Sequence, residues 1–197
     1  MTFSHNCVCV CVCVCERVRN SWKAIACTTS HCLVRILGLA GVIGPYFFEN
    51  DAGNAVTVNG VRYRNIITEF LWPQLGGMDM EGMWFQQDGA TCHTACETME
   101  LLREKFPGRV ISSNGDRNWP TRSCDLSPCD FFLWGFVKSH VYANKPQTIP
   151  ELKAEIGRVI GETEPQLRGN FIENFVKRGK VCQRSRGGHL SDIVFHN

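Results

Sequence analysis

The stretch MWFQQDGATCH, from Met83 to His93, decides the fold that the sequence predicts. Its apolar first half has the length and composition of a short buried strand, and it runs directly into the carboxylate of Asp88 and a turn at Gly89. A single carboxylate does little chemistry on its own. Asp88 is either a turn residue or one member of a set of acids whose other members lie elsewhere in the chain.

Length and composition are those of a globular domain, because the 197 residues are 44% hydrophobic and 20% charged. No apolar run approaches the ~18 residues of a membrane span, and the cysteines show no zinc-finger spacing, so we expect an intracellular protein with reduced thiols and no membrane partner. The net charge of +2 does not by itself indicate a nucleic-acid partner.

The most basic stretch is KRGKVCQRSR, which has five basic residues in ten and no acid. Two interpretations stay open: a segment that contacts DNA phosphates, or a solvated helix end followed by a loose tail. The candidate DNA contacts are Lys177, Arg178, Lys180, Arg184 and Arg186.

The first forty residues do not resemble the rest of the chain. Five of the 12 cysteines alternate with valine in the run CVCVCVCVC over residues 7–15. Such alternation suits a strand, but nothing in the run specifies a register. We interpret it as a translated dinucleotide repeat in an unrelated, low-complexity segment over residues 1–40, with a structural strand and a metal–thiolate site as alternatives.

From Gly41 onwards the pattern becomes regular and predicts an α/β fold, a mixed sheet flanked by helices. A turn or hairpin is expected at Asn59-Gly60, within the alternating run over 55–63. The expected strands cover residues 41–50, 83–87 and 109–113, with a further strand in the alternating run over 55–63. The expected helices cover residues 64–75, where Pro73 is expected to end the helix, and residues 94–106, 129–142, 148–162 and 165–178.

A second acid, Asp130, begins the helix expected over 129–142 and lies 42 positions after Asp88. A residue just past a strand and a residue in the first turn of a helix can meet at one edge of a sheet. Two carboxylates placed together repel unless a divalent cation lies between them, as in Mg²⁺-dependent phosphoryl transfer. The alternatives are a turn role for Asp88 and for Asp125, and a helix-capping role for Asp130.

Three segments then carry a resemblance: WFQQDGATCHTA, NWPTRSCDLSPCDFFLWGFVKSHVY and VCQRSRGGHLSDIVFHN. They are similar to the catalytic domain of mariner-type transposases, and the similarity extends from about residue 41 to the end of the chain. The resemblance implies a ribonuclease H-like fold that cuts and joins DNA with three acids and two Mg²⁺ ions.

The resemblance also assigns roles to individual residues. Asp88 matches the second acid, and His93 is the histidine of the same motif. Asp130 matches the third acid, and Asp125 is the earlier aspartate of that motif. It therefore predicts that Asp88 and Asp130 are catalytic residues and ligands of Mg²⁺ or Mn²⁺, that DNA is the partner, and that a functional protein would be nuclear.

The first acid of the family lies on the first strand, upstream of residues 41–50, and no counterpart is evident. Residues 1–48 contain one acidic side chain, Glu16. We therefore expect an N-terminally truncated, degenerate transposase without its first strand, made of a partial catalytic domain over 41–180 and a basic, polar tail over 181–197. Such a chain would bind nucleic acid without cutting or joining DNA strands.

Two alternatives remain open. The chain could be a weak divalent-metal-dependent DNA endonuclease in which Glu49 or Asp51 replaces the missing acid. It could also be a domesticated DNA-binding module that uses the basic stretch.

Overall fold

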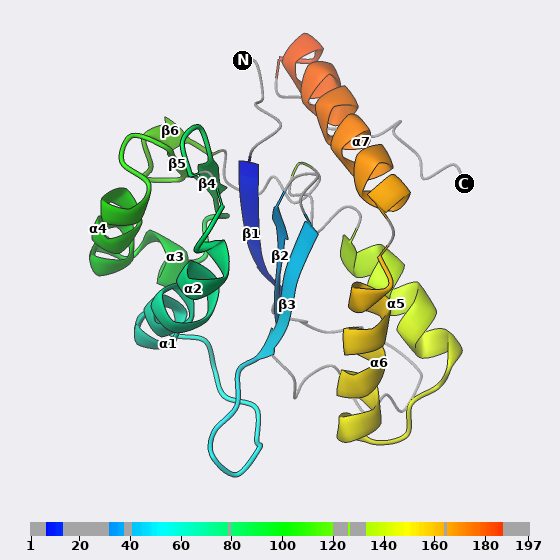
Figure 1. Cartoon of the computed structure of the whole chain (residues 1–197). Coiled ribbons are helices and arrows are strands. Elements are labelled where there is room, and N and C mark those ends of the chain that lie inside the picture. Colours follow the sequence, from blue (N-terminus) through cyan, green and yellow to red (C-terminus); the bar gives the residue numbers. More distant parts are fainter. Residues whose placement is uncertain are drawn as a thin grey trace.

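A six-stranded sheet organises the molecule, with helices on both sides of it (Figure 1). The structure, a computed structural model, describes residues 7–13, 32–37, 41–78, 80–119, 126, 133–163 and 165–186. The strands are β1 (Cys7–Cys13), β2 (Cys32–Leu37), β3 (Gly41–Phe47), β4 (Trp84–Gln86), β5 (Val110–Ser112) and β6 (Arg117–Asn118). The helices are α1 (Gly60–Asn65), the π-helix η1 (Ile66–Leu71), α2 (Trp72–Leu75), α3 (Thr91–Thr94), α4 (Cys96–Lys105), α5 (Trp134–Ala143), α6 (Ile149–Gly161) and α7 (Pro165–Arg184).

The strand order is β3-β2-β1-β4-β5-β6. The first three strands form an antiparallel meander, whereas β4 pairs in parallel with β1 and with β5, and β5 pairs in parallel with β6. The sheet is therefore mixed, as predicted. Because β1 and β4 run in the same direction, their carboxyl ends lie at the same edge of the sheet.

The Cys-Val repeat is a central strand, so our expectation that the first strand is missing is wrong. In β1, Cys9 is paired with Ile36 of β2 on one side and with Gln86 of β4 on the other. Two of the six strands come from residues 1–40, which the sequence predicts to be irregular. The repeat carries no register signal of its own, but valine favours strands, and the neighbouring strands supply the register.

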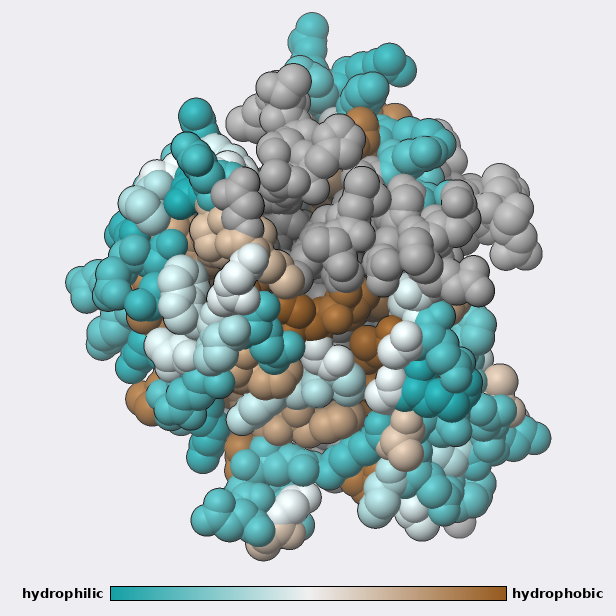
Figure 2. Space-filling view, in the orientation of Figure 1, coloured by the Kyte–Doolittle hydropathy of each residue, from teal (hydrophilic) through white to brown (hydrophobic). Residues whose placement is uncertain are grey.

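Strand β3 separates two hydrophobic cores. Ile43 belongs to the core formed with α1, η1, β4 and α4, whereas Val42 and Phe47 pack against the core of α5 and α6. In Figure 1 the helices α1 to α4 lie on one side of β1 to β3, and α5 to α7 lie on the other. Figure 2 shows hydrophobic residues in the middle of the view, near β3, between two outer regions that are mainly hydrophilic. The alternation of β3 thus fits a sheet covered by helices on both faces.

The strand expected over 55–63 is not formed, since Ala55 makes only an isolated bridge to Glu49, and the turn expected at Asn59-Gly60 is instead the start of a helix. Asn59 is the N-cap residue of α1, and its Oδ1 accepts a hydrogen bond from the backbone N–H of Arg62 (2.9 Å). Asparagine serves both turns and helix caps through the same side-chain oxygen, which explains the misassignment. The helix expected from residue 64 is present, with a π-helical segment, but Pro73 does not end it: Pro73 lies in the first turn of α2, which continues to Leu75.

Most of the remaining regular elements agree with the sequence. β4, α4, β5 and α6 lie within the predicted ranges, and α5 ends one residue beyond its predicted end. Thr148 caps α6 by accepting from the Glu151 N–H (3.3 Å). The short elements α3 and β6 were not predicted, because they lie in segments with turn and loop composition. Helix α7 continues to Arg184, beyond the predicted end and through most of the basic stretch. No helix in the described part of the chain is long and apolar enough to cross a membrane.

Candidate metal centre

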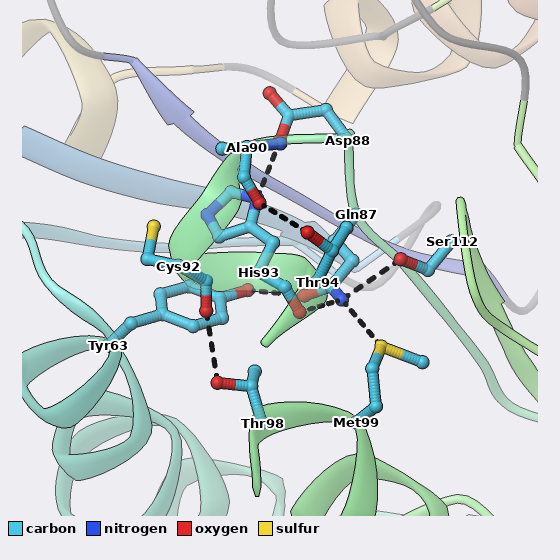
Figure 3. Close-up of polar contacts among 10 residues, drawn as sticks. All are labelled: Tyr63, Gln87, Asp88, Ala90, Cys92, His93, Thr94, Thr98, Met99 and Ser112. Atoms are coloured by element: carbon cyan, nitrogen blue, oxygen red, sulfur yellow. Dashed lines mark hydrogen bonds and ion pairs between the residues drawn. The ribbon is translucent and has the colours of Figure 1, made fainter. Parts of the chain in front are cut away.

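Asp88 lies two residues beyond the end of β4, at the carboxyl edge of the parallel part of the sheet. Its side chain is one-third exposed. One carboxylate oxygen, Oδ1, accepts two hydrogen bonds, from the backbone N–H of Ala90 (3.0 Å) and from Nδ1 of His93 (2.5 Å). In Figure 3 the second oxygen, Oδ2, points away from the His93 ring. Asp88 therefore combines both predicted roles: Oδ1 makes the contacts of a turn residue, and Oδ2 is the candidate metal ligand.

His93 lies in the short helix α3 and is fully buried. Its ring stacks on that of Tyr63 from α1, with the centroids 4.2 Å apart and the planes 34° from parallel (Figure 3). Its Nε2 has no oxygen or nitrogen partner among the described residues. An ionised carboxylate can only accept hydrogen bonds, so Nδ1 is the nitrogen that donates to Asp88.

The pair is ionised at neutral pH. Burial raises the pKa of the Asp88 carboxyl, but the hydrogen bond and charge of His93, together with the Ala90 N–H, bring it below its usual value. Burial lowers the pKa of His93, but the hydrogen bond to Asp88, the neighbouring Cys92 thiol and the Asp88 charge outweigh it and raise the pKa to about 9. Asp88 is therefore a carboxylate beside an imidazolium.

Gln87, the residue before Asp88, anchors the end of β4 in the interior. Its Oε1 accepts from the hydroxyl of Tyr63 (2.9 Å), and its Nε2 lies 2.8 Å from the carbonyl oxygen of His93, 3.1 Å from Oγ of Ser112 and 3.3 Å from the sulfur of Met99. The side chain thereby joins β4 to α1, α3, α4 and β5 (Figure 3). Sequence reasoning missed Gln87 and Tyr63; the only signal was a glutamine in an apolar strand directly before the acid.

Of the other acids predicted for the centre, the structure describes only Glu49 and Asp51, the candidate substitutes for the missing acid. Asp125 and Asp130 lie outside the described residues, so their roles stay predictions. Glu49 forms an ion pair with Lys153 of α6, and Asp51 is exposed in a turn. Both follow β3, three strand spacings from β4 in the sheet order, or about 14 Å. In the described part of the chain, no group of three His, Cys, Asp or Glu side chains could hold a metal.

No acid comes from the strand beside Asp88. The last parallel pair of β1 and β4 joins Cys9 to Gln86, and continuing that register by two residues brings Cys11 level with Asp88. The sequence of β1 is CVCVCVC. The strand that was expected to be missing is present, but it carries no acid.

The basic stretch is mostly accessible. Lys177, Lys180, Arg184 and Arg186 are exposed, and Lys177 lies 3.8 Å from Glu173 one helical turn earlier. Arg178 is buried, which removes it as a direct phosphate contact in this arrangement. DNA contact by the other four residues stays a prediction.

Comparison with known proteins identifies the fold. No protein-family model and no curated protein matches the sequence. The Mos1 transposase catalytic domain, solved with raltegravir and Mn, superposes with a TM-score of 0.66 at 19% identity, over 96% of this chain and 86% of that one. The Mos1 mariner paired end complex with Mn gives 0.67 at 18% identity, over 96% of this chain and 58% of that one. A pre-cleavage Mos1 transpososome gives 0.65 at 16% identity, over 94% and 57%.

These likenesses cover nearly the whole chain, including the segment that the sequence predicts to be unrelated. They confirm the fold predicted from the transposase resemblance, and the identities are too low to show more than the fold. The chain has the ribonuclease H-like fold of the Mos1 transposase catalytic domain.

Proposed function

We propose that this chain is a degenerate transposase that binds one divalent cation, Mg²⁺ or Mn²⁺, weakly at Asp88 and binds DNA without cutting or joining its strands. The observation that carries the proposal is the place of Asp88, an ionised and partly exposed carboxylate at the carboxyl edge of the central parallel strands. A DNA-binding role would place the protein in the nucleus.

The chemistry of the residues suits a hard cation. Mg²⁺ and Mn²⁺ prefer carboxylate oxygens, and Oδ2 of Asp88 is turned away from the buried histidine. Asp88 alone fills one of roughly six positions around Mg²⁺. Asp130 is the proposed second ligand, and a bound cation would polarise a DNA phosphate.

The missing activity follows from the strand beside Asp88. Two-metal phosphoryl transfer requires carboxylates that hold both cations, and β1 contributes none. A thousand-fold loss of rate corresponds to about 4 kcal/mol of transition-state stabilisation. We expect a loss of this size from the absence of one acid, which would bring cleavage below detection.

A plasmid assay tests this proposal. The purified protein is incubated with supercoiled plasmid and Mn²⁺, beside Asp88→Asn and a control, Glu100→Gln, which removes an exposed acid of α4 that no hypothesis assigns to the site. We expect no nicking above the buffer background from any of the three. Nicking by the wild type and by Glu100→Gln, but not by Asp88→Asn, would contradict the proposal and favour the weak endonuclease.

Metal binding is measured separately from activity. The electron paramagnetic resonance signal of free Mn²⁺ falls when protein binds the ion, so a titration gives the affinity. We expect saturable binding by the wild type and by Glu100→Gln, and none by Asp88→Asn. Equal binding by all three would contradict a site at Asp88.

The exposed basic residues of α7 favour DNA binding as a part of this function. Lys180 and Arg184 are four residues apart and lie on one face of the helix. The double variant Lys180→Gln/Arg184→Gln should lower the slope of log K against log salt by about 1.8 on duplex DNA, at about 0.9 for each phosphate contact. A matched control, Arg117→Gln/Lys145→Gln, removes two exposed charges elsewhere. A wild-type affinity that does not respond to salt would contradict phosphate contact.

A further inference from the structure

We propose that His93 is a positioning residue for Asp88, which holds Oδ1 of the carboxylate so that Oδ2 alone binds the cation. This inference rests on the proposed metal binding at Asp88. It assigns to a buried histidine a defined part in the geometry of that site.

The first step is the occupancy of Oδ1. This atom accepts from two N–H groups, the Ala90 amide at 3.0 Å and His93 Nδ1 at 2.5 Å. A carboxylate oxygen has about two lone-pair directions, and both are taken. A cation that approached Oδ1 would displace a short, charge-assisted hydrogen bond in a largely buried place.

The second step is the rigidity of the histidine. Its ring has no exposed surface and is stacked on Tyr63 at 4.2 Å. The hydroxyl of Tyr63 in turn donates to Gln87, whose amide donates to the backbone carbonyl of His93. The ring, the helix that carries it and the end of β4 are thus tied together by one buried side chain.

The third step follows from these two. The donors of Oδ1 are a backbone amide and a ring that cannot turn, so the plane of the carboxylate is fixed and Oδ2 is aimed away from the ring (Figure 3). Carboxylates bind divalent cations through one oxygen or through two. With both directions of Oδ1 taken, a bound cation would have Oδ2 as its ligand from Asp88. Partners of this kind commonly set the geometry of a metal ligand.

Two substitutions separate the hydrogen bond from the packing. His93→Phe keeps a ring against Tyr63 but removes the donor, and His93→Asn keeps a donor near the position of Nδ1 but removes the ring. The number of waters that remain on bound Mn²⁺ is measured from the relaxation of water protons. We expect about one water fewer in His93→Phe than in the wild type, because Oδ1 joins the coordination, and the wild-type number in His93→Asn.

A measurement on the unsubstituted protein keeps the inference testable if His93→Phe does not fold. With ¹⁵N-labelled histidine, the Nδ1 resonance of His93 should keep its hydrogen-bonded position when diamagnetic Mg²⁺ saturates the site. A large shift of this resonance on saturation would overturn the inference, because it would mean that the cation takes Oδ1.

The outcomes also separate this inference from the proposed function. If the wild type binds no Mn²⁺, the proposed function fails. If the wild type binds Mn²⁺ and Asp88→Asn does not, but the water number in folded His93→Phe equals that of the wild type, the function stands and the positioning role is overturned.

Discussion

Raising the pH should destabilise the fold through His93. The pKa of this side chain rises from 6.5 to about 9 on folding, so its contribution to stability is complete below pH 6.5 and is lost as the pH rises through 9. At 1.36 kcal/mol for each pH unit between the two values, the full contribution is about 3 kcal/mol. Asp88 has the opposite sign: its lowered pKa contributes stability above its unfolded value of 3.8, which is lost as the pH falls through the folded value.

Urea unfolding in EDTA and reductant, at intervals from pH 6 to pH 10, measures this contribution. Other groups titrate over the same range, so the quantity compared is the difference in unfolding free energy between the wild type and His93→Asn. We expect the difference to shrink by up to about 3 kcal/mol between pH 6.5 and pH 9.5. His140→Gln, which removes an exposed histidine, should follow the wild type throughout. Parallel curves for the wild type and His93→Asn would refute the reasoning.

Three further predictions concern the scaffold, and urea or thermal unfolding checks each of them. Gly115→Ala should destabilise the fold by about 1–3 kcal/mol, because the new Cβ would lie 2.5 Å from the backbone oxygen of Val110. Its control is Gly157→Ala in α6, whose new Cβ meets nothing within 4 Å and should stabilise the fold by up to about 1 kcal/mol. Phe106→Ala removes a fully buried ring packed against two others and should cost about 3–5 kcal/mol. Cys9→Pro removes an N–H from a strand paired on both sides and should cost at least about 1–3 kcal/mol; an unchanged stability would mean that β1 is dispensable.

The unit from Met83 to His93 was predictable because its signals are local. An apolar run, an acid, a glycine turn and a histidine follow one another within eleven residues, and the structure forms the strand and the turn in that order. The short helix α3 that carries the histidine was not predicted. The hydrogen bond between Asp88 and His93 spans five positions. A motif histidine close to a candidate ligand was visible in the sequence, although its full burial was not.

The support behind this unit was not predictable. The hydroxyl of Tyr63 reaches Gln87 across 24 positions, and Gln87 reaches Ser112 across 25. No periodicity indicates such contacts, because they depend on how α1 and β5 pack around the end of β4. A buried glutamine becomes meaningful only when its partners are in place, since each of its polar atoms must be satisfied in the interior.

The Cys-Val repeat shows a different limit. Its alternation is compatible with a strand, but a shift of two residues leaves the Cys-Val pattern unchanged, so the sequence does not distinguish one pairing register from another. The register of β1 comes from β2 and β4, which lie elsewhere in the chain. The low-complexity composition of the repeat argued against a structural role, but its pairing with β2 and β4 gives it one.

The contacts that hold Asp88 among the described side chains come from one part of the fold. Those that fix its carboxylate, directly or through His93 and Gln87, come from residues 63–112, in α1, β4, α3, α4 and β5. Strand β1 meets β4 through backbone pairing. The contacts of Asp88 are formed although β1 carries no acid. This arrangement makes metal binding without cleavage a physically consistent outcome, since the described supports of the ligand lie in one part of the fold and the missing acid belongs to another.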